Sequence, residues 1–267
     1  MKTDSEDALS DLRIPDFWDR IASSRETFLG LDYDGTLAPF RVERMDALPE
    51  PGIPRLLDEI SRSTKTDLVI ISGRPVSELA TLLGSVSCML VGSHGFETMS
   101  PDGTHSFRNP DALQGRGLAL AEEIGEKEGL GKRLEVKIAS VALHTRGLSP
   151  EDARALQDRF CEQWNALREF HDLEIRRFNG GIELRSRGWD KGEVLLGVLQ
   201  TKPEGTFSVY IGDDDTDEDA FRVIRDRGIG IKVGVPSRDT AARGFLHDIP
   251  EVKVFLETWL AYAPRKK

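Results

Sequence analysis

The stretch LDYDGTLAPF, residues 31–40, decides the fold and the chemistry of this chain. The apolar residues 28–31 that lead into it are predicted to form a buried strand, and two carboxylates, Asp32 and Asp34, follow directly at its carboxyl end. Open α/β sheets bind their ligands at the carboxyl ends of the strands. A pair of carboxylates at that place can divide the work, because one can attack as a nucleophile while its neighbour moves a proton.

Two further polar motifs fall where a strand ends or a helix begins. The predicted strand 67–71 ends in Ser72 and Gly73, and a hydroxyl at this place, just before a helix, can hydrogen-bond an oxygen of a phosphoryl group. Lys191 precedes the predicted helix 193–199, where an ammonium that faces carboxylates can hold a phosphate as a point charge. Both motifs indicate a site for an anionic group.

An acidic run completes the pattern. The predicted strand 207–211 opens through Gly212 into DDDTDED, residues 213–219, in which six of the seven residues are acidic. Like charges packed this closely repel one another unless a cation lies among them. Because the available ligands are hard carboxylate oxygens and no cluster of His or Cys accompanies them, the sequence favours Mg²⁺ over Zn²⁺.

The four motifs resemble, in order and in context, those of the haloacid dehalogenase (HAD) superfamily of phosphotransferases. The resemblance implies that Asp32 is the nucleophile and that Asp34 is the general acid and base. The residues expected to contact the phosphate are Ser72, Gly73 and Lys191. Those expected to hold Mg²⁺, with Asp34 acting through its backbone carbonyl, are Asp32, Asp34 and Asp213. An outer shell that supports the metal is expected from Asp214 and Asp217.

The composition restricts the class of partner. The chain has 267 residues and a net charge of −10, a balance that argues against nucleic acids and anionic membranes as partners. Any phosphate must therefore be held by local cations. The acidic residues 1–10 lack the features of a signal peptide, no apolar run is long enough to span a bilayer, and the two cysteines are expected to be reduced. The expected location is the cytoplasm.

Strands and helices alternate in the two ends of the chain. Residues 1–104 and 189–267 are therefore predicted to form an α/β core with a Rossmann-like parallel sheet and right-handed crossovers. The predicted core strands are 28–31, 67–71, 88–91, 207–211 and 229–233, and the predicted core helices are 54–63, 76–83, 193–199 and 252–262. Residues 1–24 are expected to form a helix or a loose arm that packs on this core.

An insert interrupts the core. Residues 105–188 follow an α-β-β-α-β-β order and are predicted to fold as a smaller, antiparallel α+β cap. The predicted cap helices are 111–128 and 151–167, and the predicted cap strands are 134–140, 141–146, 173–178 and 182–186. The last two strands are expected to form a hairpin across residues 179–181, where an Asn-Gly-Gly sequence favours a turn.

Over about residues 27–246 the chain resembles the trehalose-6-phosphate phosphatases, a HAD branch with this type of cap (C2B). The segments that carry the resemblance are DYDGTL (32–37), ISGR (71–74), GSHG (92–95), EVK (135–137), VALH (141–144), ELR (183–185) and GDDDTDED (212–219). The resemblance implies Mg²⁺-dependent hydrolysis of trehalose 6-phosphate to trehalose and inorganic phosphate through an aspartyl-phosphate intermediate. Substrate contacts are implied for Glu135, Lys137, Glu183, Arg74, His94 and Arg185.

The cap residues in this set also make physical sense by themselves. Glu135 and Lys137 are two apart in a predicted strand, as are Glu183 and Arg185, so each pair projects from one face of a sheet. A sugar is read by side chains that donate and accept hydrogen bonds at fixed places. The alternative is a solvated sheet face with cross-strand ion pairs. Two such pairs in one cap favour a polyol as the ligand that the cap binds.

Other functions remain compatible with the same core. One is the hydrolysis of another glycosyl phosphate, such as glucosylglycerol phosphate, glucosyl-phosphoglycerate or sucrose phosphate. The cap residues would then decide which of these sugar phosphates is bound. Another is a catalytically silent domain that binds a sugar phosphate, which predicts lost motif residues, whereas all four motifs are intact. The expected partner is a small sugar phosphate, with no nucleic acid and no membrane. A separate trehalose-6-phosphate synthase is a candidate protein partner, and a monomer is the expected state.

Overall fold

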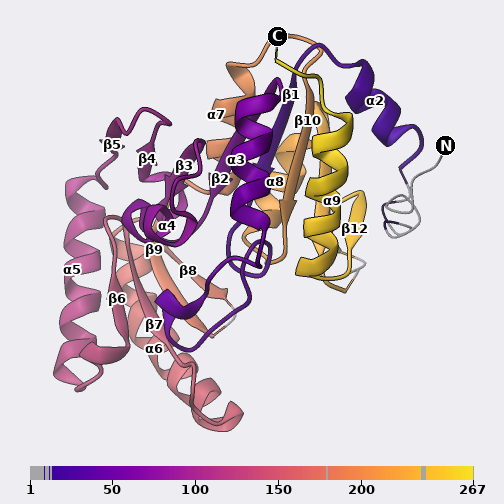
Figure 1. The fold of residues 1–267 in the computed structure, drawn as a ribbon. Helices are drawn as coiled ribbons and strands as arrows, with labels where there is room; N and C mark the ends of the chain where they lie inside the picture. Colours follow the sequence, from indigo (N-terminus) through magenta and orange to yellow (C-terminus); the bar gives the residue numbers. More distant parts are fainter. Residues whose placement is uncertain (1–8, 10–11, 13, 179, 236–238, 267) are drawn as a thin grey trace. The chain divides into compact units, whose positions relative to one another are not determined.

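The computed structural model describes Leu9, Leu12 and residues 14–178, 180–235 and 239–266 (Figure 1). The chain divides into two compact units. The core unit consists of Met1–Ser106 and Asp190–Lys267, and the cap unit consists of Phe107–Trp189. Each unit has its own sheet and its own cluster of buried apolar side chains.

Eight strands form the sheet of the core unit. They are β1 (Thr27–Leu31), β2 (Thr66–Ile71), β3 (Met89–Gly92), β4 (Glu97–Met99), β5 (His105–Phe107), β10 (Phe207–Gly212), β11 (Gly228–Val233) and β12 (Gly244–Leu246). Their order across the sheet is β12-β11-β10-β1-β2-β3-β4-β5. The strands from β12 to β3 pair in parallel, and β3 pairs with β4 in antiparallel fashion. Parallel neighbours need crossover connections, and among the described residues helices supply them for every parallel pair except β11 and β12.

Helices cover both faces of this sheet. They are α2 (Phe17–Ser23), α3 (Ile53–Ser63), α4 (Val76–Leu83), α7 (Lys191–Gln200), α8 (Asp217–Ile224) and α9 (Ile249–Tyr262), with short 3₁₀ turns at η2 (Arg44–Asp46) and η3 (Ser93–Gly95). Figure 1 shows α3 and α9 on one face, with α7 and α8 on the other. The apolar sides of α2, α3, α4 and α9 pack with the strands in one continuous cluster. Because both faces are covered, the central strands are mostly apolar and almost wholly buried.

Strand β1 lies at the centre of the sheet, between β10 and β2. All five of its residues are buried. Leu31 pairs with Ile211 of β10 and with Ile70 of β2, and the amide of Asp32 donates to the carbonyl of Ile211 at 2.9 Å. The carboxyl ends of three neighbouring strands therefore meet at one edge, which brings together the polar segments that follow them.

The cap unit combines an antiparallel sheet with two long helices. The sheet has the order β6-β7-β9-β8, built from β6 (Leu134–Val136), β7 (Ser140–His144), β8 (Leu173–Phe178) and β9 (Gly181–Ser186). Helices α5 (Ala112–Lys127) and α6 (Pro150–Phe170) bury the apolar side chains of one face, which include Val141, Leu143, Ile182 and Leu184. Side chains alternate along a strand, so the residues between these project from the opposite face.

The predicted fold class is confirmed, since the core is a mainly parallel α/β unit and the cap an antiparallel α+β unit. Strands β4, β5 and β12 were not predicted, because they have three residues each and are too short to show a repeating pattern. Strands β6 and β7 are shorter than predicted, because residues 137–139 connect them. In the N-terminal segment α2 forms a helix, whereas residues 1–8, 10–11 and 13, and Asn179 of the predicted hairpin turn, lie outside the described residues. None of the described helices is long and apolar enough to cross a membrane.

Candidate active site

Lys191 lies between two buried carboxylates at the edge where β1 and β10 end. Its ammonium nitrogen is 2.9 Å from Asp32 Oδ1 and 2.8 Å from Asp217 Oδ1. The Asp190 side chain caps α7 by accepting from the Glu193 amide at 3.0 Å, which fixes the helix start that carries Lys191. Burial works to lower the pKa of Lys191, but the Asp217 and Asp32 carboxylates raise it well above its usual value, so the ammonium stays charged.

The carboxylate of Asp217 is fully buried and surrounded by donors. Its Oδ1 accepts from the Tyr210 hydroxyl at 2.6 Å and from Lys191. Its Oδ2 accepts from the backbone amides of Asp213 and Asp214 at 3.1 and 3.0 Å. A carboxylate has about four lone-pair positions. Asp217 therefore has little capacity left for a metal ion, and its contacts hold other groups of the site in place.

Asp213 offers the oxygen that best fits a cation. Its Oδ1 is buried without a hydrogen-bond partner in the part of the chain that the structure describes, and carboxylate oxygens of Asp32, Asp213 and Asp217 lie within 4.8 Å of one another. Gly35, with a φ of 78°, permits this placement, because a Cβ there would collide with the Asp213 carboxylate. Burial and the nearby Asp32 and Asp217 raise the pKa of Asp213 to about 9. Burial also raises the pKa of Asp32 to about 7, although Lys191 opposes this.

These observations fit a divalent cation. The donors are carboxylate oxygens, which hard cations such as Mg²⁺ and Ca²⁺ prefer. A bound cation would offset both the burial of the carboxylates and their mutual repulsion. The backbone carbonyl of Asp34, which the HAD resemblance implies as a further ligand, stays a prediction.

A divalent cation is expected to stabilise the protein more at high pH than at low pH. Without metal, the folded-state pKa values of Asp213 (about 9) and Asp32 (about 7) lie above their unfolded values. The fold therefore loses stability as the pH rises from about 4 towards about 9. A cation binds the ionised carboxylates, so the rise in melting temperature on adding Mg²⁺ should grow between about pH 6 and about pH 9. Thermal unfolding with and without Mg²⁺ measures this rise, and a rise that is flat or shrinks with pH would contradict the site.

Asp34 pairs with an arginine and stands apart from the other carboxylates. Nε and Nη2 of Arg74 donate to the two oxygens of Asp34, each at 2.7 Å, and this bidentate contact fixes the orientation of the carboxylate. Nη1 of Arg74 donates to the Arg44 carbonyl at 3.0 Å and to Glu78 at 3.2 Å. The guanidinium is thus engaged on all its edges within the core unit. Its predicted contact with substrate stays a prediction.

Ser72, Gly73 and His94 lie together where β2 and β3 end. The Ser72 hydroxyl accepts from the Arg74 amide at 3.2 Å, and the Ser72 carbonyl accepts from the His94 amide at 3.1 Å. The His94 ring lies directly against the backbone of Gly73, since a Cβ at residue 73 would be 2.7 Å from Nε2 of that ring. The structure therefore brings the predicted phosphate-binding loop and His94 into one packed unit, and glycine is needed for the approach.

On the cap, predicted substrate residues form a connected set on the polar face of the sheet. Lys137 Nζ is 2.8 Å from Glu183 Oε1, and the Ser140 hydroxyl donates to the same oxygen at 2.7 Å. Glu135 is 2.7 Å from the His144 ring and 4.0 Å from Lys137 Nζ. The side chains of Glu135, Lys137 and Glu183 are 10%, 8% and 5% exposed. They form a largely buried array of ion pairs and hydrogen bonds, and their contact with substrate stays a prediction.

Arg185 lies on the same polar face and has donors to spare. Its side chain is 3% exposed, and Nε donates to Glu174 Oε1 at 2.6 Å. Nη1 and Nη2 are buried with no hydrogen-bond partner among the described residues. Unpaired donors of a buried guanidinium cost free energy, so this edge favours a bound hydroxyl or oxyanion.

Two further residues have contacts or positions that belong to the site. Tyr210 reaches Asp217 from the middle of β10, where its apolar neighbours predict only packing, so the sequence carried no signal for its contact. The Thr36 hydroxyl is buried without a hydrogen-bond partner among the described residues, two positions after Asp34. The sequence could have indicated Thr36 by its place in the turn after the two carboxylates. Its hydroxyl is a candidate donor to a bound anion.

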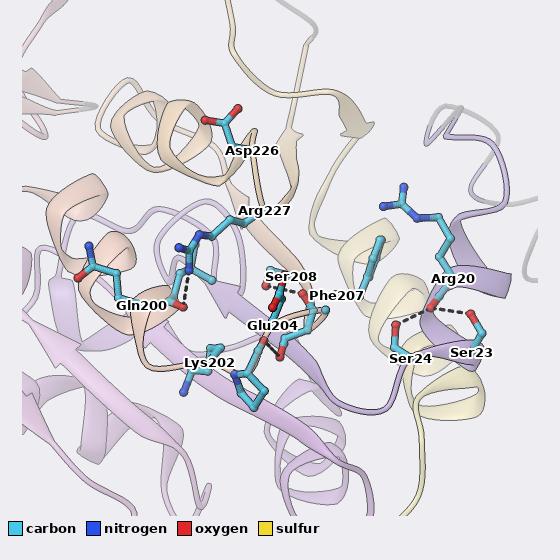
Figure 2. A pocket seen from close by; sticks show the side chains of 14 residues that line it. Arg20, Ser23, Ser24, Gln200, Lys202, Glu204, Phe207, Ser208, Asp226 and Arg227 are labelled. Atoms are coloured by element: carbon cyan, nitrogen blue, oxygen red, sulfur yellow. Dashed lines mark hydrogen bonds between the residues drawn. The ribbon is translucent and has the colours of Figure 1, made fainter.

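A pocket of about 810 Å³ lies elsewhere in the core unit, at the amino ends of β10 and β11 (Figure 2). Arg227 donates to the Leu199 carbonyl at 3.0 Å on one side of it, and on another side the Arg20 guanidinium lies 4.5 Å from the centroid of the Phe207 ring. None of the predicted site residues lines this pocket. The carboxylates follow the other end of β10, so the pocket is separate from the candidate site.

The sequence and the fold both have known relatives. The profile of the trehalose-phosphatase family matches residues 30–249. Trehalose 6-phosphate phosphatase RA3 of Zea mays is 30% identical over 88% of this chain and 70% of its own length. A trehalose-phosphate phosphatase of Mycobacterium tuberculosis is 32% identical over 79% of this chain. The matched region covers 54% of that relative's own length.

Solved structures share the fold. The C-terminal domain of trehalose-6-phosphate phosphatase from C. albicans superposes with a TM-score of 0.78 at 23% identity, covering 92% of this chain and 94% of that one. HAD-like hydrolases are also among the structural neighbours. At these levels of identity the likeness shows the fold alone.

Proposed function

This chain belongs to the trehalose-phosphatase family of the HAD superfamily, and we propose that it hydrolyses trehalose 6-phosphate to trehalose and inorganic phosphate with the aid of Mg²⁺. The family predicted from the sequence motifs is confirmed. The observation that carries the proposal is the buried contact of Asp32 and Lys191, 2.9 Å apart, beside the unpaired oxygen of Asp213. It provides a nucleophile, a cation for the phosphate and an oxygen for a metal in one place.

Two carboxylates divide the proposed chemistry. In the first step an oxygen of Asp32 forms a bond to phosphorus, the bond from phosphorus to the sugar oxygen breaks, and Asp34 gives that oxygen a proton. In the second step Asp34 takes a proton from water, the water oxygen bonds to phosphorus, and the bond to Asp32 breaks. Arg74 holds both oxygens of Asp34 in place for these transfers. Lys191 and Ser72 are proposed to bind the other phosphoryl oxygens.

The metal is proposed to be Mg²⁺, held by Asp32, Asp213 and the backbone carbonyl of Asp34. When bound, it supplies positive charge that lets an anionic nucleophile approach an anionic ester. The buried and unpaired Oδ1 of Asp213 supports this part of the proposal. The remaining charge on the phosphoryl oxygens would be balanced by Lys191, which stays protonated at its position between two carboxylates.

The polar face of the cap sheet is proposed to read the sugar. Replacing Glu135, Lys137 or Glu183 with alanine should lower kcat/KM on trehalose 6-phosphate by about ten-fold or more, because each loses a charged hydrogen bond worth about 1.5–3 kcal/mol. The same variants should change kcat/KM on p-nitrophenyl phosphate little, since that ester offers no sugar hydroxyls. Steady-state kinetics on both esters measures this difference.

A matched control for these variants is Glu123→Ala, which removes an exposed carboxylate from a cap helix. It should leave kcat/KM on both esters near the wild-type value. Equal losses on both esters for the variants of the sheet face would show that the sugar is bound elsewhere.

Phosphate release from a panel of sugar phosphates tests the substrate. Trehalose 6-phosphate should give the highest kcat/KM, ahead of sucrose phosphate, glucosylglycerol phosphate and glucosyl-phosphoglycerate. A higher value for one of these would favour the alternative glycosyl phosphate. Binding of trehalose 6-phosphate without any release of phosphate in Mg²⁺ would favour a silent binding domain.

A further inference from the structure

We propose that Tyr210 is a positioning residue: its buried hydroxyl fixes Asp217, and Asp217 in turn holds the Lys191 ammonium beside Asp32. The inference rests on the proposed phosphatase function, because that function assigns the ammonium to the phosphoryl group. Tyr210 acts through Asp217, to which its hydroxyl donates.

The Tyr210 hydroxyl makes a strong hydrogen bond in a fully buried place. It donates to Asp217 Oδ1 at 2.6 Å, and both side chains are 0% exposed. Burying a hydroxyl is unfavourable unless it is hydrogen-bonded, and a charged acceptor makes the stronger bond. Burial and the Asp217 carboxylate raise the pKa of Tyr210 well above its usual value, so the hydroxyl remains a donor.

Two glycines in neighbouring strands seat this pair. Gly30 of β1 pairs with Tyr210 in register, and a Cβ at residue 30 would lie only 2.8 Å from Cδ2 of the tyrosine ring. Gly212 of β10 leaves room for the Asp217 carboxylate, with which a Cβ at that position would collide. The Phe221 ring packs edge-on against Tyr210 with centroids 5.9 Å apart. Glycine weakens a strand, so its use at both positions indicates that close approach is required there.

The hydroxyl affects Lys191 because both donate to the same oxygen. Asp217 Oδ1 accepts from the Tyr210 hydroxyl at 2.6 Å and from the Lys191 ammonium at 2.8 Å. The same ammonium is 2.9 Å from Asp32 Oδ1. Without the hydroxyl, Oδ1 would have the ammonium as its remaining donor, and their attraction would strengthen in this buried site. The ammonium would then be drawn towards Asp217 and away from Asp32 and the phosphoryl oxygens.

Tyr210→Phe removes the hydroxyl and keeps the ring, and Tyr33→Phe is the matched control. Tyr33 is also 0% exposed, and its hydroxyl donates at 2.7 Å to the Ala47 carbonyl, outside the carboxylate cluster. The full chain, wild type and both variants, is measured for kcat and KM on trehalose 6-phosphate and on p-nitrophenyl phosphate. Melting temperature and the affinity for beryllium fluoride, a phosphoryl mimic, are measured in the same Mg²⁺ buffer.

Tyr210→Phe should lower kcat by a common factor of about ten or more on both esters, whereas Tyr33→Phe should stay within about two-fold of wild type. Beryllium fluoride should bind Tyr210→Phe more weakly, and the two melting temperatures should fall by similar amounts. A Tyr210→Phe variant with the kcat and the beryllium fluoride affinity of Tyr33→Phe would overturn the proposal, as would a loss confined to the sugar phosphate. Failure of the wild type to hydrolyse trehalose 6-phosphate would instead overturn the proposed function, and p-nitrophenyl phosphate would still test Tyr210.

Discussion

Replacing Asp32 with asparagine is expected to lower the turnover of trehalose 6-phosphate by on the order of 10³-fold or more. The amide has nearly the same shape as the carboxylate, but it is a poor nucleophile and a weak ligand for a hard cation. Lys191 keeps its other carboxylate, Asp217, at 2.8 Å, so the ammonium remains near its place. Phosphate release under steady-state conditions measures the loss. Near wild-type turnover would show that Asp32 is not the nucleophile.

The same variant should remain folded, which separates loss of chemistry from loss of structure. Burial, against the opposing effect of Lys191, raises the pKa of Asp32 to about 7, so above that pH its charge destabilises the metal-free fold. Asparagine removes this charge. In EDTA near pH 8, the melting temperature of Asp32→Asn should therefore equal or exceed that of the wild type. A marked fall would mean that the lost activity reflects unfolding.

Removal of divalent metal with EDTA is expected to lower activity by on the order of 10²-fold or more, and Mg²⁺ should restore it. Without a cation, a phosphate ester would have to approach a cluster of buried carboxylates, two of which already share the ammonium of Lys191. Zn²⁺ should restore less activity, because the described residues of the cluster offer carboxylate oxygens and no nitrogen or sulfur ligand. Full activity in metal-free buffer would reject the metal site.

A matched pair of variants locates the metal. Asp213→Asn should abolish the rise in melting temperature that Mg²⁺ causes, because it removes the buried oxygen without a partner. Asp215→Asn, an exposed residue of the same acidic run, should leave that rise unchanged. An equal effect of both variants would indicate a diffuse attraction of cations to the run as a whole.

Much of the fold was predictable because its signals are local. The apolar residues 28–31 and 207–211 read as buried strands, and the structure pairs them in register at the centre of the sheet. Their carboxyl ends lie at one edge because the strands are parallel, whereas the prediction that Asp32 and Asp213 share a metal came from the HAD resemblance. The short strand β12, residues 244–246, could not be predicted in this way, because three residues give no period and its pairing depends on β11.

The site was predicted less completely, because a sequence motif identifies residues but does not show which groups their side chains contact. The sequence pointed to Asp34 and Arg74 separately, while their bidentate contact joins residues 40 positions apart and depends on two strand ends being adjacent. Tyr210 looked like a core residue, because nothing in its apolar neighbours shows that its hydroxyl meets a carboxylate from the next helix. Contacts of this kind follow from packing and register, which no local pattern records.

Chemical trapping of phosphorylated Asp32 tests the central claim most directly. The chain is quenched while it turns over trehalose 6-phosphate in Mg²⁺ and is then treated with borohydride, which reduces an acyl phosphate and converts an aspartyl-phosphate into homoserine. An Asp34→Asn variant, which lacks the group that protonates the sugar oxygen and activates water, is quenched alongside for comparison. Mass spectrometry of the digested chain should find homoserine at residue 32 and at no other aspartate, and only when the sugar phosphate is present. Homoserine at a different residue, or none in either chain while the wild type releases phosphate, would contradict the account.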